Sequence, residues 1–309
     1  MSAIPYQEYG ARETYPPPFY SHGGRFLGLV MNGDAAKIKT LLDTMLNEPA
    51  EGKVEYTAIG HRVVLLVGSF DELGSSAPGY VGQGVVGETQ MSIWLPLRAK
   101  YADGSERICL TAPYVFVDNP MSLLCGREDF GYPKALAQFE PPRWTGAGIQ
   151  IEVFGGNFGK VARAGWTQIL SVTPAGGPAP AAAIANDPIA VAEELVARAT
   201  GTSDSATLLG LIGEIKEVIE YLQGKARQAF LKQFRDAAVA GEACYREVVE
   251  APARVSVGSV GLSPYEWHVA IAELKSHPIV ADLGLASEST PLAFELEMDI
   301  TLGVGEVIK

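Results

Sequence analysis

Residues 117–139 read VDNPMSLLCGREDFGYPKALAQF. One lysine of this stretch, Lys134, follows closely on Phe130, Tyr132 and Pro133, and further apolar residues stand on both sides of it. A glycine and a proline just before the lysine restrict the backbone, which predicts a rigid turn there. An isolated lysine is usually solvated, but one that packs among apolar side chains loses water, and desolvation lowers the pKa of a lysine. Since a neutral amine attacks carbonyl carbons, the stretch predicts an imine-forming lysine.

The remainder of the chain is typical of a β-rich protein. Apolar runs and alternating patterns predict strands at 25–32, 63–70, 88–97, 107–117, 149–154, 247–260 and 292–302. The continuous apolar run at 63–70 predicts a strand buried on both faces. Asp103 and Gly104 predict a hairpin turn between the third and fourth of these strands. An amphipathic helix is expected at 35–46, with Asp34 as its N-cap, so the predicted class is α+β.

Two segments differ from this β pattern. Residues 1–24 are polar and proline-rich, which predicts an extended N-terminal arm. Residues 173–183 are low in complexity, and amphipathic helices are predicted after them at 189–199 and 207–222. We expect these helices to form an insert at about 187–226 within a single domain of residues 1–309. Their apolar stripe packs either on its own domain or on another subunit, and the sequence leaves both alternatives open.

Composition and charge limit the class of partner. The chain has 309 residues, of which 47% are hydrophobic and 19% charged, as in a soluble globular protein. The formal net charge of −12 argues against nucleic acid and anionic membranes, because both attract basic surfaces. The sequence shows neither a signal peptide nor an apolar run long enough to cross a membrane. Three cysteines without CxxC spacing predict reduced thiols, so we expect a cytoplasmic protein.

The sequence also lacks the spacing of the common metal and phosphate sites. Its four histidines are scattered and form no metal-binding motif, so we expect no catalytic metal. The glycine-rich stretch 74–87 has no phosphate-binding pattern and is interpreted as a loop, a potential lid over a pocket. No cofactor is therefore expected.

The blocks Asp118-Asn119, Gly126-Arg127-Glu128 and Gly131-Tyr132-Pro133-Lys134 together resemble the signature of the acetoacetate decarboxylase family. Weaker similarity extends over most of the chain, apart from the helical insert. The resemblance implies a cone-like closed β-barrel with the lysine inside and helices outside, assembled as a homo-oligomer. It also implies that Lys134 forms a Schiff base with a small oxo-acid substrate.

The resemblance points to further site residues. Glu88 matches a pocket glutamate of the family and is expected to act as an acid/base. Arg25 lies next to the place of a family arginine that is expected to hold the substrate carboxylate. Tyr265 is a candidate for proton transfer, with a packing role as its alternative. Arg127 is either a substrate contact or a brace for the turn before Lys134.

The chain also departs from the family pattern. Decarboxylases of the family usually carry a second lysine directly after the first, where this chain has Ala135. A second family glutamate falls near the apolar Leu65, with Asp71 and Glu72 as nearby substitutes. Family members that lack the second lysine include enzymes that use the imine for aldol condensation and dehydration.

The expected protein is a Schiff-base-forming carbon–carbon lyase, with three activities open. The first is decarboxylation of an acetoacetate-like β-oxo acid. The second is imine-dependent aldolase, dehydratase or cyclase chemistry on a pyruvate-like acid, which Ala135 favours. The third is non-catalytic binding of an oxo acid, against which the combination of Lys134 and Glu88 argues, because a binder needs no activated amine.

Overall fold

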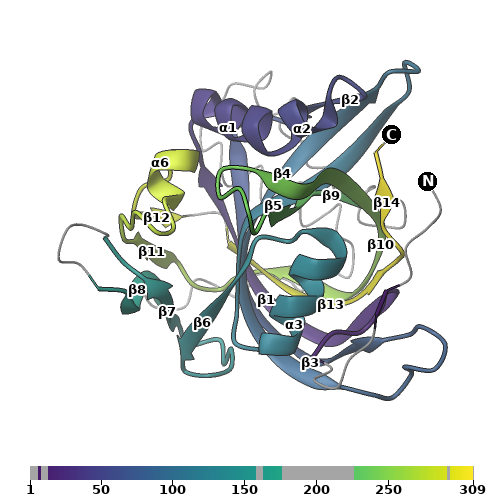
Figure 1. The fold of residues 1–309 in the computed structure, drawn as a ribbon. Coiled ribbons are helices and arrows are strands. Elements are labelled where there is room, and N and C mark those ends of the chain that lie inside the picture. The colour runs from purple at the N-terminus through teal and green to yellow at the C-terminus, as the bar shows by residue number, and fades with distance from the viewer. Residues whose placement is uncertain (1–5, 8–12, 158–162, 176–225, 291–292, 309) are drawn as a thin grey trace.

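The computed structural model describes residues 6–7, 13–157, 163–175, 226–290 and 293–308. Most of them belong to strands (Figure 1), which are β1 (Phe19–Asn32), β2 (Val54–Ala58), β3 (Arg62–Ser75), β4 (Val86–Tyr101), β5 (Glu106–Val117), β6 (Lys134–Glu140), β7 (Ile149–Gly155), β8 (Gly165–Pro174), β9 (Ala226–Arg235), β10 (Ala243–Leu262), β11 (Trp267–Ile271), β12 (Glu288–Thr290), β13 (Ala293–Leu302) and β14 (Glu306–Val307). The helices are α1 (Ala35–Leu42), α2 (Glu48–Ala50), α3 (Pro120–Cys125) and α6 (Ile279–Leu283), with π-helical segments η1 (Asp43–Asn47) and η2 (Gly126–Phe130). The insert predicted at about 187–226 lies outside the described residues, apart from Ala226, where β9 begins.

The long strands close into a hydrogen-bonded ring. Its order is β4-β5-β9-β10-β13-β1-β3 and back to β4. Neighbours in the ring are antiparallel except β5 and β9, which run parallel and meet at Leu110 and Gln228. The structure therefore confirms the predicted β-rich fold in its coarser form: the strands close into a hydrogen-bonded ring, with few helices among the described residues.

A second sheet branches from this ring beside Lys134. Strand β6 pairs in parallel with the end of β5, where Lys134 lies opposite Val115. The sheet continues from β6 through β7, β8 and β11 to β12. Lys134, the first residue of β6, therefore lies at the junction between ring and side sheet.

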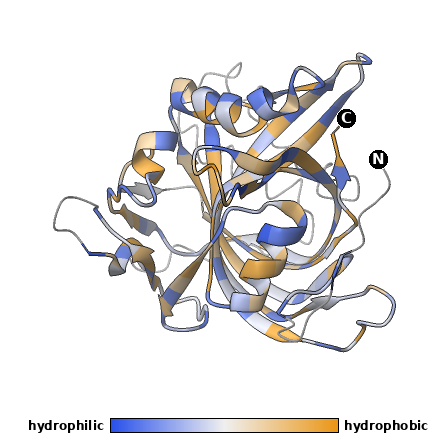
Figure 2. Ribbon diagram, in the orientation of Figure 1, coloured by the Kyte–Doolittle hydropathy of each residue, from blue (hydrophilic) through white to orange (hydrophobic). Residues whose placement is uncertain are grey.

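The two faces of the ring strands have different surroundings. On β4, Met91, Ile93, Leu95 and Leu97 belong to the main hydrophobic core, together with residues of α1 and of the side sheet. The alternate residues Glu88, Gln90, Ser92 and Trp94 face a cavity instead. Side chains of a strand alternate between its faces, so one strand serves both core and cavity. Figure 2 shows hydrophilic and hydrophobic residues side by side along α1 and α2, as in helices with one face on the core.

Several predicted elements are confirmed with changed bounds. Asp34 caps α1 by accepting hydrogen bonds from the backbone of Ala36 and Lys37, and the helix continues through η1 and α2 to Ala50. The hairpin turn between β4 and β5 contains Gly104 with a φ of 83°. Strand β1 begins at Phe19, so it includes the end of the predicted arm.

Two features of the fold were not predicted. In β3, burial alternates over its first half, so the expectation of a strand buried on both faces holds only near its middle. The sequence analysis predicts no helix at 120–125, although Asn119 caps α3 by accepting hydrogen bonds from the backbone N–H groups of Met121 and Ser122. A proline in the first turn of a helix is favourable, because its missing N–H has no partner there. None of the helices in the described part of the chain is long and apolar enough to cross a membrane.

We expect Gly131→Ala to destabilise the protein much more than Gly104→Ala. Both glycines have positive φ, 86° and 83°. A Cβ at Gly104 would meet open space, whereas one at Gly131 would lie 2.5 Å from Lys232 Cα. The cost should be about 1 kcal/mol for Gly104→Ala and roughly 2–5 kcal/mol for Gly131→Ala. Urea unfolding of both variants measures this, and equal losses would contradict the close approach of Gly131 to β9.

Candidate active site

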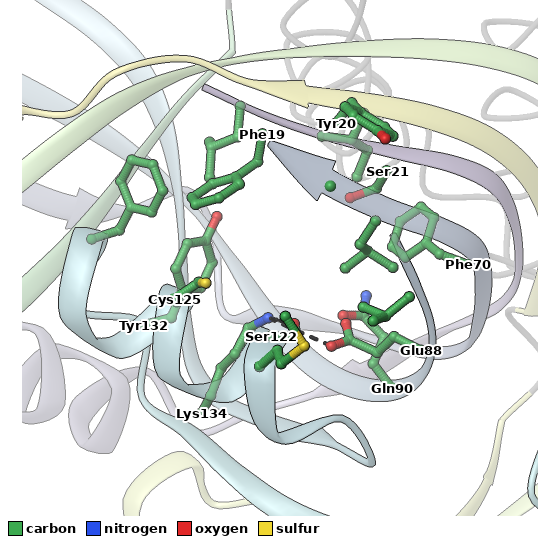
Figure 3. A pocket seen from close by; sticks show the side chains of 18 of the residues that line it. Phe19, Tyr20, Ser21, Phe70, Glu88, Gln90, Ser122, Cys125, Tyr132 and Lys134 are labelled. Atoms are coloured by element: carbon green, nitrogen blue, oxygen red, sulfur yellow. Dashed lines mark hydrogen bonds and ion pairs between the residues drawn. The ribbon is translucent and has the colours of Figure 1, made fainter. Parts of the chain in front are cut away.

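A cavity of about 140 Å³ lies inside the ring and is mostly apolar (Figure 3). Ring strands supply most of its lining, and residues of α3, η2 and β6 complete it. Helix α3 therefore lines the cavity through Met121, Ser122 and Cys125, in contrast to the expectation that helices lie only outside. This position of α3 places the hydroxyl group of Ser122 next to the amine of Lys134.

Lys134 extends into this cavity with its amine held by two neighbours. Its Nζ donates a hydrogen bond to Ser122 Oγ at 2.6 Å and lies 3.8 Å from Glu88 Oε2. The Lys134 side chain is only 12% exposed. Gly126 makes room for it, because a Cβ there would lie 2.8 Å from Lys134 Cδ.

Glu88 is the buried carboxyl group of the site, with a side chain 1% exposed. Burial raises the pKa of Glu88, and the charge of Lys134 and a hydrogen bond from Ser122 oppose that rise. Glu88 Oε2 has no hydrogen-bond partner, since 3.8 Å to Lys134 Nζ is too long for one. The site therefore combines a weakly hydrated amine with a carboxyl group that favours its protonated form.

Arg25, predicted to hold a substrate carboxylate, does not reach the cavity. Its Nη2 lies 3.0 Å from Asp71 Oδ1 at the surface, and Arg143 Nη2 lies 3.1 Å from the same oxygen. Arg25 shares its face of β1 with Leu27 and Leu29, which belong to the core outside the ring. Strand alternation thus directs Arg25 away from the interior.

The other two candidate site residues, Arg127 and Tyr265, also lie outside the cavity. Arg127 is exposed and donates to the backbone oxygen of Lys134 at 3.0 Å, which matches its alternative role as a brace. Tyr265 packs on Trp267, with ring centroids 6.0 Å apart, and lies half-buried against the main core. Neither residue lines the cavity.

The positions at which this chain departs from the family pattern lie outside the cavity. Ala135 packs against the main core, on the opposite face of β6 from Lys134. Leu65 is buried in the same core, and Asp71 and Glu72 are exposed, so none of the three supplies a second carboxyl group to the cavity. The identity of residue 135 therefore has little direct effect on the cavity.

Sequence reasoning missed several polar residues of the cavity. Ser122 lies on the unpredicted helix α3, and Gln90 follows Glu88 at the spacing of one strand face, a signal that could have identified it. Tyr132 donates a hydrogen bond to Gln228 Oε1, and burial raises the pKa of Tyr132. Gln228 lies in β9, far along the chain, and nothing in its local sequence indicates this role.

Comparison with solved structures shows the same fold. An acetoacetate decarboxylase from Legionella pneumophila is 14% identical, with a TM-score of 0.58 over 100% of this chain and 93% of that chain. The enduracididine biosynthesis enzyme MppR, solved with pyruvate, is 12% identical, with a TM-score of 0.55 over 96% and 91%. An acetoacetate decarboxylase-like enzyme from Sphingomonas wittichii is 14% identical, with a TM-score of 0.54 over 94% and 92%.

Comparison at the level of sequence identifies the family despite these low identities. No curated protein matches the sequence. The family model for acetoacetate decarboxylase, however, matches residues 3–280, which include every residue of the described cavity except Ile300 and Leu302. The chain therefore belongs to the acetoacetate decarboxylase family.

Proposed function

We propose that this protein is a Schiff-base-forming carbon–carbon lyase that decarboxylates an acetoacetate-like β-oxo acid through Lys134. The observation that carries the proposal is the position of Lys134 Nζ, inside a mostly apolar cavity and 3.8 Å from the buried Glu88. A lysine amine in such a place is suited to nucleophilic attack on a carbonyl group.

The proposed reaction begins when the neutral amine of Lys134 adds to the ketone carbon. A proton from solvent lets the hydroxyl group of this adduct leave as water, and a protonated imine remains. The carbon–carbon bond to the carboxylate then breaks, CO₂ departs, and its electron pair passes into the protonated imine to form an enamine. Glu88 donates a proton to the enamine carbon, and water hydrolyses the resulting imine to release the ketone. Solvent returns the proton to Glu88, while Ser122 Oγ orients the amine.

The charge of the cavity favours loss of CO₂ over retention of the carboxylate. Among the described residues that line it, the cation is Lys134, and there is no arginine. A substrate carboxylate that has left water therefore has only the protonated imine as a counter-charge. Conversion to neutral CO₂ relieves this desolvated charge, an effect that an arginine pair would weaken.

We expect borohydride to trap acetoacetate on Lys134 as an acetone-sized adduct, located by peptide mass spectrometry. The adduct and CO₂ release should both disappear in Lys134→Met, which keeps the apolar stem without the amine. A pyruvate-sized adduct that keeps its carboxylate, without the acetone-sized one, would support aldolase, dehydratase or cyclase chemistry instead. No adduct on Lys134 over a broad panel of oxo acids would favour non-catalytic binding.

We expect Glu88→Gln to separate imine formation from turnover. The amide keeps the size of the side chain but donates no proton to the enamine, so kcat should fall by roughly 10²–10⁴-fold while borohydride trapping persists. Arg25→Gln, which changes a side chain outside the cavity, is the control and should leave turnover unchanged. An unaltered kcat in Glu88→Gln would exclude Glu88 as the proton donor.

We also expect Glu88→Gln to change how stability depends on pH. Because burial raises the pKa of Glu88 above its ordinary 4.5, the folded protein binds this proton more tightly than the unfolded chain does. The contribution of Glu88 to wild-type stability should therefore fall as pH rises from about 4.5 towards the raised pKa, by at most about 1.4 kcal/mol per pH unit.

The Glu88→Gln variant lacks this loss. Its free energy of unfolding, relative to that of the wild type, should therefore increase as pH rises. Urea unfolding at a series of pH values measures the difference. Thr111→Val, which changes a buried hydroxyl that does not titrate in this range, should show a constant difference. If the free energy of unfolding of the wild type instead increased relative to that of Glu88→Gln as pH rises, the raised pKa of Glu88 would be contradicted.

A further inference from the structure

We infer that the cavity selects β-oxo acids that carry one negative charge and a compact apolar tail, and that it rejects dicarboxylates. The inference rests on the proposed function, because the bond to Lys134 defines where the head of the substrate lies. The tail is the substituent on the far side of the reacting carbonyl carbon.

The cavity has a polar side and an apolar side. Figure 3 shows Lys134, Ser122, Glu88 and Gln90 together on one side and Phe19 across the cavity from them, while Phe70 lies beside Glu88, its partner on the neighbouring strand. Ile300 and Leu302 of β13 add to the apolar lining. A substrate bound at Lys134 therefore directs its tail towards aromatic and aliphatic side chains.

On the apolar side of the cavity, the described lining has no charged side chain that could pair with a charge on the tail. Lys134 and Glu88 are the ionisable acid–base pair of the polar side. Arg25 and Arg143 are bound to Asp71 outside the cavity. A second carboxylate would therefore lose its water without gaining a partner, which is strongly unfavourable.

The volume of the cavity limits the size of the tail. A cavity of about 150 Å³ with an apolar lining is known to hold one benzene molecule, and this cavity measures about 140 Å³. Because the same volume must also hold the head of the substrate beside Lys134, a branched tail of a few carbon atoms suits it better than a long chain. Each methylene that the tail buries should strengthen binding by about fourfold.

Ser21 offers a way to reverse the selectivity. It lines the cavity on the side opposite Lys134 (Figure 3), on β1 between Phe19 and the bulge that precedes Gly24. Ser21→Arg would place a cation among the tail-binding residues. Ser21→Gln is the matched control, because it adds a long polar side chain without a charge.

Unreactive acids test the selectivity without requiring chemistry. In succinate, a carboxylate replaces the isopropyl group of 4-methylpentanoate with nearly the same shape. By titration calorimetry, the wild type should bind 4-methylpentanoate at least about 100-fold more tightly than succinate. Ser21→Arg should strengthen succinate binding at least about tenfold and weaken 4-methylpentanoate binding, whereas Ser21→Gln should not improve succinate binding.

Reactive acids of the same shapes give a second measurement. Oxaloacetate is the dicarboxylate counterpart of 4-methyl-3-oxopentanoate, and borohydride trapping on Lys134 should favour the latter by a similar factor. Failure to trap any oxo acid would remove the proposed lyase function but leave the calorimetric result intact.

The inference is overturned if the wild type binds succinate as tightly as 4-methylpentanoate. It is also overturned if a folded Ser21→Arg variant, verified by its thermal unfolding, keeps the wild-type preference. The wild-type comparison needs no variant, so a misfolded Ser21→Arg protein would still leave the inference open to refutation.

Discussion

The site depends on keeping one amine and one carboxyl group side by side with little water around them. Lys134 and Glu88 are 12% and 1% exposed, and their nearest charged atoms are 3.8 Å apart. Either group alone would be costly to bury, and each reduces the cost of the other. The closed ring provides the enclosure, because its strands surround the cavity and leave no open sheet edge towards it. The main core packs on the outer face of the same strands, so stability and the cavity come from opposite faces of one sheet.

The residues of the 117–139 stretch control the path of the backbone that delivers the lysine. Gly126 leaves room for the stem of Lys134, and Gly131 adopts a positive φ against the backbone of β9. Arg127 holds the carbonyl oxygen of Lys134 from the surface. These contacts place the start of β6 against β5, where the side sheet leaves the ring. These three residues of the motif therefore act on the position of a single amine.

The electrostatic character of the cavity distinguishes this chain from the expectation based on its family resemblance. The predicted arginine clamp is absent from the described lining, because Arg25 is engaged with Asp71 on the outer face of the ring. The lining instead offers neutral polar groups beside Lys134 and aromatic rings across from it. Such surroundings are the physical basis of the proposed loss of the substrate's negative charge as CO₂ and of the proposed exclusion of a second charge.

The sequence alone determined the features that depend on neighbouring residues: the β-rich class, the Asp34 cap, the turn at Gly104 and the apolar setting of Lys134. It also identified Glu88, through family resemblance and not through a local pattern. Only the tertiary structure decided which strands close the ring, which face of β1 points inward, and that Ser122 meets the lysine. The bulge between Ser21 and Gly24 shows why. A shift of one residue in strand register moves every later side chain to the other face, so the direction of Arg25 depends on pairing across the whole sheet and not on its sequence neighbours.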